Sequence, residues 1–261
     1  MAAIIKEEWE IDLMRRAGRI VAAALRTLEE RVRPGVSTAE LDAVFERSVR
    51  EAGACPTFKG YRGFPASICA SINEEVVHGI PSPDRLLKEG DILSVDCGAT
   101  YKGYVGDMAV TLPVGRVDER ARRLIGTARG ALEAAIRVVG PGVRLSQVSA
   151  TIQEYVESRG FSVVKKFVGH GVGRSMHEEP QIPNYVLQPL ESFDLVLQPG
   201  LCLAIEPMVN EGTDEVETLP NRWTVVTRDR KWSAHFEHTV AVTRDGREVL
   251  TQAGGGPALS A

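Results

Sequence analysis

The first 50 residues carry a hydrophobic repeat with helical spacing. Apolar side chains recur every three or four positions, at Leu13, Ala17, Ile20, Ala24 and Leu28. This spacing predicts a helix over residues 8–32 that buries one face. The chain then turns at Pro34-Gly35. Ser37, with Glu40 three residues later, forms the capping-box pattern that starts a second helix running up to Gly53.

The same pattern returns 107 residues later, since position 34 corresponds to position 141. A Pro-Gly-Val turn stands at 34–36 and again at 141–143, and each is followed by an apolar helical stripe and a closing glycine, Gly53 or Gly160. The recurrence indicates an internal duplication, with two halves of similar build. The other matched pairs are Leu25 and Leu132, Leu41 and Val148, Phe45 and Ile152, and Val49 and Val156.

Each helical pair is followed by sequence typical of strands. Residues 92–96 and 201–206 are apolar runs that begin soon after a glycine, and the apolar run 239–243 closes the sheet. Residues 100–111 contain glycines at positions 103 and 106, as a turn would. We therefore expect helices followed by strands in each half.

Acidic residues occupy matching places in these strands. Asp96 in the first half and Glu206 in the second each end an apolar strand, and Asp107 and Glu237 each lie on the next candidate strand of their own half. An ordinary strand-end or turn residue is the favoured interpretation of any one acid alone. Four acids in matching places favour a shared site.

The negative charge of four clustered acids has to be compensated. An ionised carboxylate in a core is unfavourable unless it is paired, hydrogen-bonded or bound to a metal. Lys102 is the one candidate cation close in sequence to the first pair of acids. One or two divalent cations would relieve the mutual repulsion of four carboxylates.

Three histidines are candidate partners of the acids. His170 lies in the glycine-rich stretch 169–173, His177 precedes Glu178, and His78 lies in a turn flanked by extended sequence. An ordinary loop histidine remains an alternative for His170, whereas a phosphate loop is disfavoured because no Lys-Ser/Thr follows the glycines. One imidazole among four carboxylates suits Mn, Co, Fe or Zn in a two-metal arrangement.

That chemistry favours hydrolysis. Two metal ions can share a water molecule, lower its pKa and polarise a carbonyl, while a carboxylate moves the proton. The chain has no GxSxG or HExxH motif and no cysteine in a thiol-protease context. A metal-assisted hydrolase is therefore expected.

Composition and charge exclude several other classes. The 261 residues are 43% hydrophobic and 25% charged, as in a folded globular chain, and the net charge of −4 argues against a surface wholly devoted to nucleic acid. The four cysteines lack CxxC spacing, which indicates buried thiols in a reducing compartment. No secretory signal or membrane-length apolar run is present, so a cytoplasmic location is expected.

Five segments together resemble the signature blocks of type I methionine aminopeptidases. The resemblance runs from about residue 5 to 250, and the blocks are residues 71–81, 90–111, 169–185, 203–209 and 223–243. It implies the α/β (α+β) pita-bread fold, with pseudo-twofold duplicated halves and a curved antiparallel sheet covered by helices. It further implies one catalytic domain over residues 1–252 of the bacterial style, without an N-terminal zinc finger, and a flexible tail over 253–261.

The resemblance also implies a ligand set for two divalent ions, whose native identity among Co, Mn, Fe and Zn stays open. Asp107 and Glu237 would bridge the ions, Asp96 would complete one, and His170 with Glu206 would complete the other. Glu206 would also shuttle the proton of the metal-bridging hydroxide.

The remaining histidines receive roles by the same resemblance. His177 would contact the scissile carbonyl, and His78 would hydrogen-bond the substrate near its amine. His238, on the opposite face of the strand from Glu237, is expected to be structural. His235 stands where the family usually has Gln, a departure expected to alter only local hydrogen bonding.

A methionine pocket is implied as well. Two of its residues, Phe58 and Met176, differ from those usual in the family, and each aromatic alone could equally belong to a core. An apolar, polarisable lining suits a thioether side chain. The implied lining is Phe58, Tyr61, Phe64, Cys69, Met176 and Trp223.

The implied activity is removal of the N-terminal methionine from nascent proteins and peptides whose second residue is small. The alternatives are an Xaa-Pro peptidase of the same fold and a non-catalytic binding protein that retains the ligands. A monomer without membrane contact is expected. Two arginine clusters indicate either solvated helix faces, which we favour, or a transient ribosome contact. The segment 185–198 is slightly longer than usual in the family, and we assign it no function. The clusters are Arg15, Arg16, Arg19 and Arg120, Arg122, Arg123.

Overall fold

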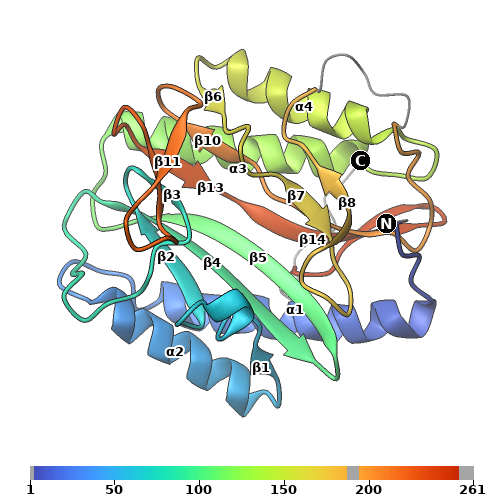
Figure 1. The fold of residues 1–261 in the computed structure, drawn as a ribbon, viewed down its shortest axis with the longest axis horizontal. Helices are drawn as coiled ribbons and strands as arrows, with labels where there is room; N and C mark the ends of the chain where they lie inside the picture. Colours follow the sequence, from blue (N-terminus) through green and yellow to red (C-terminus); the bar gives the residue numbers. More distant parts are fainter. Residues whose placement is uncertain (1–2, 187–193, 253–261) are drawn as a thin grey trace.

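Two similar halves share one curved antiparallel sheet in the computed structural model, which describes residues 3–186 and 194–252 (Figure 1). Each half begins with a pair of helices and continues into strands, as the repeated sequence pattern predicts. The expected tail, 253–261, lies outside the described residues, and so does the middle of the segment 185–198. None of the described helices combines the length and the apolar character that crossing a bilayer requires.

The first half contains two helices, a single 3-10 turn and five strands. Its elements are α1 (Glu8–Glu29), α2 (Thr38–Glu51), β1 (Cys55–Pro56), η1 (Tyr61–Gly63), β2 (Ile68–Ile72), β3 (Glu75–Val77), β4 (Ile92–Tyr101) and β5 (Tyr104–Pro113).

The second half also begins with two helices and continues into ten described strands. Its elements are α3 (Glu119–Val138), α4 (Leu145–Glu157), β6 (Ser162–Val163), β7 (Gly169–Gly171), β8 (Glu178–Ile182), β9 (Cys202–Ile205), β10 (Met208–Asn210), β11 (Val216–Thr218), β12 (Val225–Thr227), β13 (Ser233–His235), β14 (Glu237–Thr243) and β15 (Gly246–Val249).

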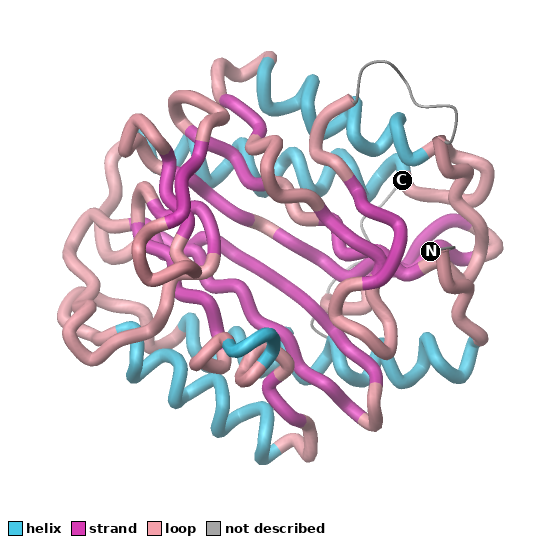
Figure 2. Tube along the Cα trace, in the orientation of Figure 1, coloured by secondary structure: helices cyan, strands magenta, loops and turns pink. Residues whose placement is uncertain are grey.

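The central sheet joins the halves through β5 and β14. Its strand order is β1-β4-β5-β14-β9-β7-β8, with β2 also paired to β4 and β15 to β14. Figure 2 shows the strands between the two pairs of helices. Helices α1 and α2 cover strands of the first half and α3 covers strands of the second, so that each half has its own apolar core.

Local sequence explains how the helices start and stop. Ser37 and Glu40 form the predicted capping box, in which the Ser37 hydroxyl accepts from the backbone N–H of Glu40. Helix α1 ends at Glu29, three residues earlier than predicted. The chain tightens there because the N–H groups of Arg31 and Val32 donate to carbonyls three residues back.

Two details of the first half differ from the prediction. Asp96 lies in the middle of β4 rather than at a strand end, because β4 continues as far as Tyr101. Gly106 lies within β5 rather than in a turn; the turn is formed by Lys102 and Gly103, both with positive φ. Gly106 is instead needed where α1 crosses β5, because a Cβ there would lie 2.5 Å from the Gly18 backbone nitrogen.

Helix α1 is brought this close to the sheet by Gly18, which yields a stability prediction. A Cβ at Gly18 would lie 2.3 Å from the Leu250 carbonyl oxygen, so Gly18→Ala should displace α1 and destabilise the protein by at least about 1 kcal/mol. The control is Gly126→Ala in α3, where the added methyl meets nothing within 4 Å, and which should stabilise by about 0.5–1 kcal/mol. Urea denaturation of both variants measures the difference. Equal stability of Gly18→Ala and wild type would contradict the close approach.

Candidate active site

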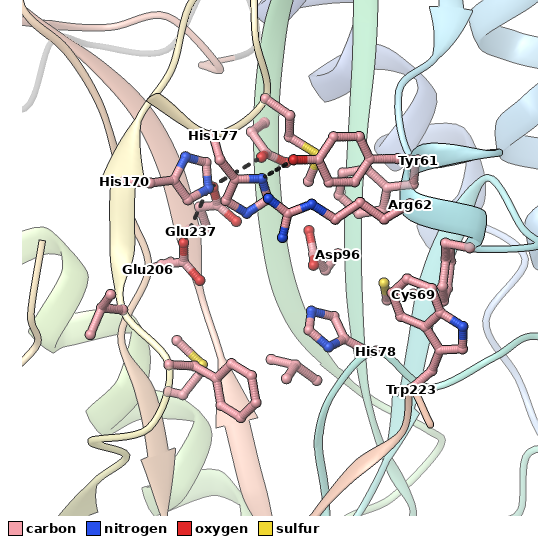
Figure 3. Close-up of a pocket in the computed structure, with 18 residues that line it drawn as sticks. Tyr61, Arg62, Cys69, His78, Asp96, His170, His177, Glu206, Trp223 and Glu237 are labelled. Carbon is pink, nitrogen blue, oxygen red and sulfur yellow. Dashed lines mark hydrogen bonds and ion pairs between the residues drawn. The ribbon is translucent and has the colours of Figure 1, made fainter. Parts of the chain in front are cut away.

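One cavity of about 250 Å³ collects every residue that the sequence assigned to the site. It lies where the two halves meet, and both halves contribute to its walls. Glu206, Glu237 and His170 lie on one side in Figure 3, Asp96 lies near the middle, and Cys69 and Trp223 lie on the other side. The predicted residues around it are Phe58, Tyr61, Phe64, Cys69, His78, Asp96, Asp107, His170, Met176, His177, Glu206, Trp223 and Glu237.

Strand register brings the acids of the first half and Glu237 onto one face of the sheet. Ala109 on β5 pairs with Asp96 on β4 and with Glu237 on β14. Asp107 lies two residues before Ala109 and therefore emerges on the same face. The small Ala109 side chain leaves the space between three carboxylates open.

The second half adds Glu206 and His170 by the same principle. His170 on β7 pairs with Ala204 on β9, two residues before Glu206, so their side chains emerge on one face. His170 Nε2 lies 3.4 Å from Glu206 Oε1 and 3.9 Å from Asp107 Oδ2. The sheet thus brings together four acids and one imidazole that lie up to 141 positions apart, from 96 to 237.

Protein cations do not compensate these acids. Among the described residues, no lysine or arginine forms an ion pair with any of the four, and Lys102 lies over the ring of Tyr101 instead. Asp96 Oδ1, Asp107 Oδ1 and Glu237 Oε1 are buried without a hydrogen-bond partner. Orphaned carboxylate oxygens of this kind fit divalent metal ions, which prefer several oxygen ligands.

Burial governs the titration of the cluster. Desolvation raises the pKa of Asp107 to about 7, and desolvation together with the neighbouring carboxylates raises the pKa of Asp96, Glu206 and Glu237 well above their ordinary values. Burial, and next the nearby His177, lowers the pKa of His170 to about 3. The imidazole of His170 is therefore neutral at physiological pH.

The tautomer of His170 suits a metal ligand. Its Nδ1 lies 2.9 Å from the Gly171 carbonyl oxygen, which can only accept, so Nδ1 carries the proton. The lone pair is then on Nε2, which faces the carboxylates. A backbone partner that fixes the second ring nitrogen is the usual arrangement for metal-binding histidines.

His235, expected only to alter local hydrogen bonding, lies beside two of the carboxylates. Its Nε2 lies 3.8 Å from Glu206 Oε2 and 4.0 Å from Glu237 Oε2, and both ring nitrogens are buried without a partner. Two sets of donor atoms are compact enough for a metal ion, Asp107–His170–Glu237 and Glu206–His235–Glu237. The available signal was its place in the sequence, two residues before Glu237.

Apolar side chains form the other end of the cavity. Phe58, Phe64 and Cys69 are buried together, and Met176 and Trp223 pack against them. The Phe64 and Trp223 rings meet edge to face, with centroids 5.1 Å apart. Further lining residues could not be predicted, because an apolar residue of a cavity has the same sequence pattern as one of a core. They are Val77, Phe167, Val168 and Met208.

His177, Tyr61 and Arg62 form the exposed mouth of the cavity (Figure 3). The Tyr61 hydroxyl lies 2.9 Å from His177 Nδ1, and the two rings stack with centroids 5.5 Å apart. Desolvation, and next the Arg62 cation, lowers the pKa of His177. Arg62 was not predicted, although it adjoins the predicted Tyr61.

His78 lies deeper, between the carboxylates and the apolar end (Figure 3). Its backbone adopts a left-handed φ of 61°, and its ring meets Trp223 edge to face at 6.2 Å. Burial, and next His177, lowers its pKa to about 4. His238 faces away, as expected, with Nδ1 2.8 Å from the Thr251 hydroxyl.

Comparison with known proteins gives consistent matches. The model of "Metallopeptidase family M24" matches residues 12–244. The methionine aminopeptidase of Clostridium acetobutylicum is 51% identical over 95% of this chain and 98% of its own, and methionine aminopeptidase 1 of Bacillus subtilis is 50% identical over 95% and 99%. The crystal structure of a Thermotoga maritima methionine aminopeptidase superimposes with a TM-score of 0.93 at 47% identity, covering 96% of this chain and all of that one.

The raised pKa of Asp107 predicts how the metal-free protein responds to pH. A carboxyl with a folded pKa of about 7 and an unfolded pKa of about 3.9 binds its proton more tightly when folded, so its contribution to stability falls as pH rises between these values. Metal-free Asp107→Asn should therefore gain stability relative to metal-free wild type, by less than about 1 kcal/mol at pH 4 and by about 4 kcal/mol at pH 7.

Chemical denaturation in the presence of a chelator measures this difference, and the wild type at each pH is the control. Added Mn²⁺ or Co²⁺ should raise the stability of wild type at pH 7 much more than that of Asp107→Asn. A difference between the two proteins that does not change with pH would contradict the titration of Asp107.

Proposed function

The chain belongs to metallopeptidase family M24, and from that premise we propose how its buried carboxylates act in hydrolysis. It is a metalloaminopeptidase that removes the N-terminal methionine of peptides, as its relatives' names and their match over nearly the whole chain indicate. These matches do not favour the two alternatives, an Xaa-Pro peptidase and a non-catalytic binding protein. The observation that carries the mechanism is a cluster of uncompensated buried acids at the end of an apolar cavity.

We propose that the cluster holds two divalent ions. Asp107 and Glu237 would bridge them, Asp96 would complete one, and His170 with Glu206 would complete the other. Orphaned oxygens on three of the acids and the free Nε2 of His170 support this assignment. When bound, such ions lower the pKa of a water molecule and polarise a carbonyl. Co, Mn, Fe and Zn all suit this donor set.

The apolar end of the cavity would bind the methionine side chain. Phe58, Phe64 and Trp223 supply flat apolar surfaces, and the Cys69 sulfur adds a polarisable one. A thioether placed there would direct the substrate's amine and its first peptide bond toward the carboxylates and His78. We further propose that the second side chain of the substrate is small, as the family resemblance implies.

His177 would donate a hydrogen bond to the scissile carbonyl oxygen. The Tyr61 hydroxyl can donate to His177 Nδ1, which leaves the proton of a neutral ring on Nε2, free to point at the substrate. The lowered pKa of His177 keeps the ring neutral. A preorganised donor at this place stabilises negative charge as it develops on the carbonyl oxygen.

Glu206 would move the proton. Burial, and next Asp96 and Asp107, raise its pKa and so strengthen its carboxylate as a proton acceptor, and its side chain is 13% exposed, so it borders the cavity. It would accept the proton of the attacking water and deliver it to the leaving amine nitrogen. Solvent access at the mouth would then allow release of methionine.

We further propose that the enzyme works as a cytoplasmic monomer on nascent chains. The arginine clusters give the ribosome contact little support, because Arg15 pairs with Glu248, Arg120 with Glu211, and Arg122 with Glu119. These pairs favour solvated helix faces, whose ion pairs contribute little individually.

Peptide cleavage across a metal panel tests the proposed function. After chelation, activity on Met-Ala-Ser should vanish and then return with one or more of Co, Mn, Fe and Zn, because the four acids need a cation to act. Ala-Met-Ser should not be cleaved, because alanine does not fill the apolar end. Mass spectrometry of the products measures both. Comparable rates on the two peptides, or activity that survives exhaustive chelation, would refute the proposal.

Substitution of His177 tests the proposed carbonyl donor. His177→Ala should lower kcat by about 10²–10³-fold, because one oxyanion donor is lost, while metal content stays unchanged. Tyr61→Phe should lower kcat less, because the His177 ring stays in place and loses only the hydrogen bond from the Tyr61 hydroxyl. Single-turnover kinetics and metal analysis provide the measurements. A normal kcat in His177→Ala would remove this role.

A further inference from the structure

Lys6 is buried outside the carboxylate cluster. Lysine side chains are almost never fully buried unless they are paired, so the partner of Lys6 is of interest. Its side chain is 3% exposed, and the side chain of its partner Glu178 is 6% exposed. Lys6 Nζ donates to Glu178 Oε2 at 2.7 Å and to the Ile4 carbonyl at 3.1 Å. This ion pair joins the N-terminal segment to a residue 172 positions later.

The other oxygen of Glu178 closes the loop that precedes it. Glu178 Oε1 accepts from the backbone N–H of Ser175 at 3.1 Å. Gly173 lies against the ion pair, since a Cβ there would be 2.6 Å from both Glu178 Oε1 and Lys6 Cε. The Lys6–Glu178 ion pair therefore packs against the start of loop 173–178, and Glu178 bonds to its middle.

The backbone of Lys6 is itself fixed from the opposite side. Its N–H donates to the Gly200 carbonyl at 2.8 Å, and a Cβ at Gly200 would lie 2.7 Å from the Lys6 carbonyl oxygen. Gly200 immediately precedes Leu201 and β9, the strand that leads to Glu206. Lys6 therefore links the segment before Glu206 to the loop that carries His177.

His177 has few other restraints. It directly precedes Glu178, it is exposed at the mouth, and its ring has one hydrogen-bond partner among the described residues, the Tyr61 hydroxyl. Its ring also lies 4.2 Å from the ring of His170, centroid to centroid. The backbone on either side of His177 is held by the pairing of Glu178 with Gly171 and by the hydrogen bond from the Gly173 N–H to the Ser175 carbonyl, so the contacts of the Glu178 side chain act on the residue next to His177.

We propose that Lys6 is a positioning residue of the active site: acting through Glu178, it holds loop 173–178 so that the His177 ring faces the scissile carbonyl. This inference rests on the donor role proposed for His177. The loop's other ionic contact, Arg174 with Glu10 at 3.8 Å, is longer and its arginine is exposed, so it restrains the loop less.

A double-mutant cycle separates positioning from general stabilisation. Lys6→Met keeps the length of the side chain and removes its charge, and it should lower kcat on Met-Ala-Ser about 10- to 100-fold, with KM and metal content within twofold of wild type. In a His177→Ala background the same substitution should change kcat by less than about threefold, because the group that Lys6 positions is already gone.

The control is Lys59→Met, which breaks an exposed ion pair of the same length, Lys59 with Glu46 at 2.7 Å, and should leave kcat unchanged. Circular dichroism establishes that each variant is folded at the assay temperature. Glu178→Gln replaces Lys6→Met in the cycle if the latter does not fold, because a neutral amide of the same shape also breaks the ion pair.

The possible outcomes are distinct. If Lys6→Met lowered kcat equally in the wild-type and His177→Ala backgrounds, the positioning role would be overturned and the donor role of His177 would stand. A normal kcat in Lys6→Met would have the same meaning. A normal kcat in His177→Ala would instead overturn the donor role itself, and with it any effect of Lys6 through that residue. A loss confined to the wild-type background supports the inference.

Discussion

Mutual repulsion among four buried carboxylates is the constraint on which the rest of the structure depends. Asp96, Asp107 and Glu237 lie on one face around Ala109, and Glu206 completes the cluster from β9. Their raised pKa values express the cost of keeping them together without a compensating cation. A rigid sheet backed by helices supplies the fixed frame that such an unfavourable arrangement requires, and metal ions turn the same cluster into a stabilising one.

The duplicated fold holds the four repelling carboxylates in place. Each half has its own helices and core, and each contributes two acids to the junction between β5 and β14. The close crossing of α1 over β5 at Gly18 and Gly106 places a helix directly behind Asp107. Apolar packing within each half thus fixes polar atoms at the boundary between the halves, where substrate can reach them.

Sequence periodicity was sufficient to predict the elements whose structure is determined by neighbouring residues. The capping box at Ser37 and Glu40 and the repeated helix pairs depend on neighbouring residues, and all are present. The mid-strand location of Asp96 and the strand location of Gly106 were missed, because strand length and helix crossings depend on distant partners. The fold of the whole sheet followed from the family resemblance rather than from the pattern.

Some residues of the candidate site could be predicted from the sequence and others could not. Acids and histidines stood out because charged groups in apolar stretches need an explanation, whereas Phe167 and Met208 could not be told from core residues. His235 was expected only to alter local hydrogen bonding, and its approach to Glu206 and Glu237 was not predicted. The burial of Lys6 could not be predicted, since it depends on a contact across 172 positions.

The location of β14 has a consequence for biosynthesis. This strand separates β5 from β9 in the sheet, yet it is among the last parts of the chain to be made. Until it emerges from the ribosome, β5 and β9 each present an unpaired edge, which is the feature that invites wrong pairing in incomplete chains. A chain that stops before residue 237 therefore lacks both the strand that joins the halves of the central sheet and the fourth acid, so catalytic competence arises only when synthesis is almost complete.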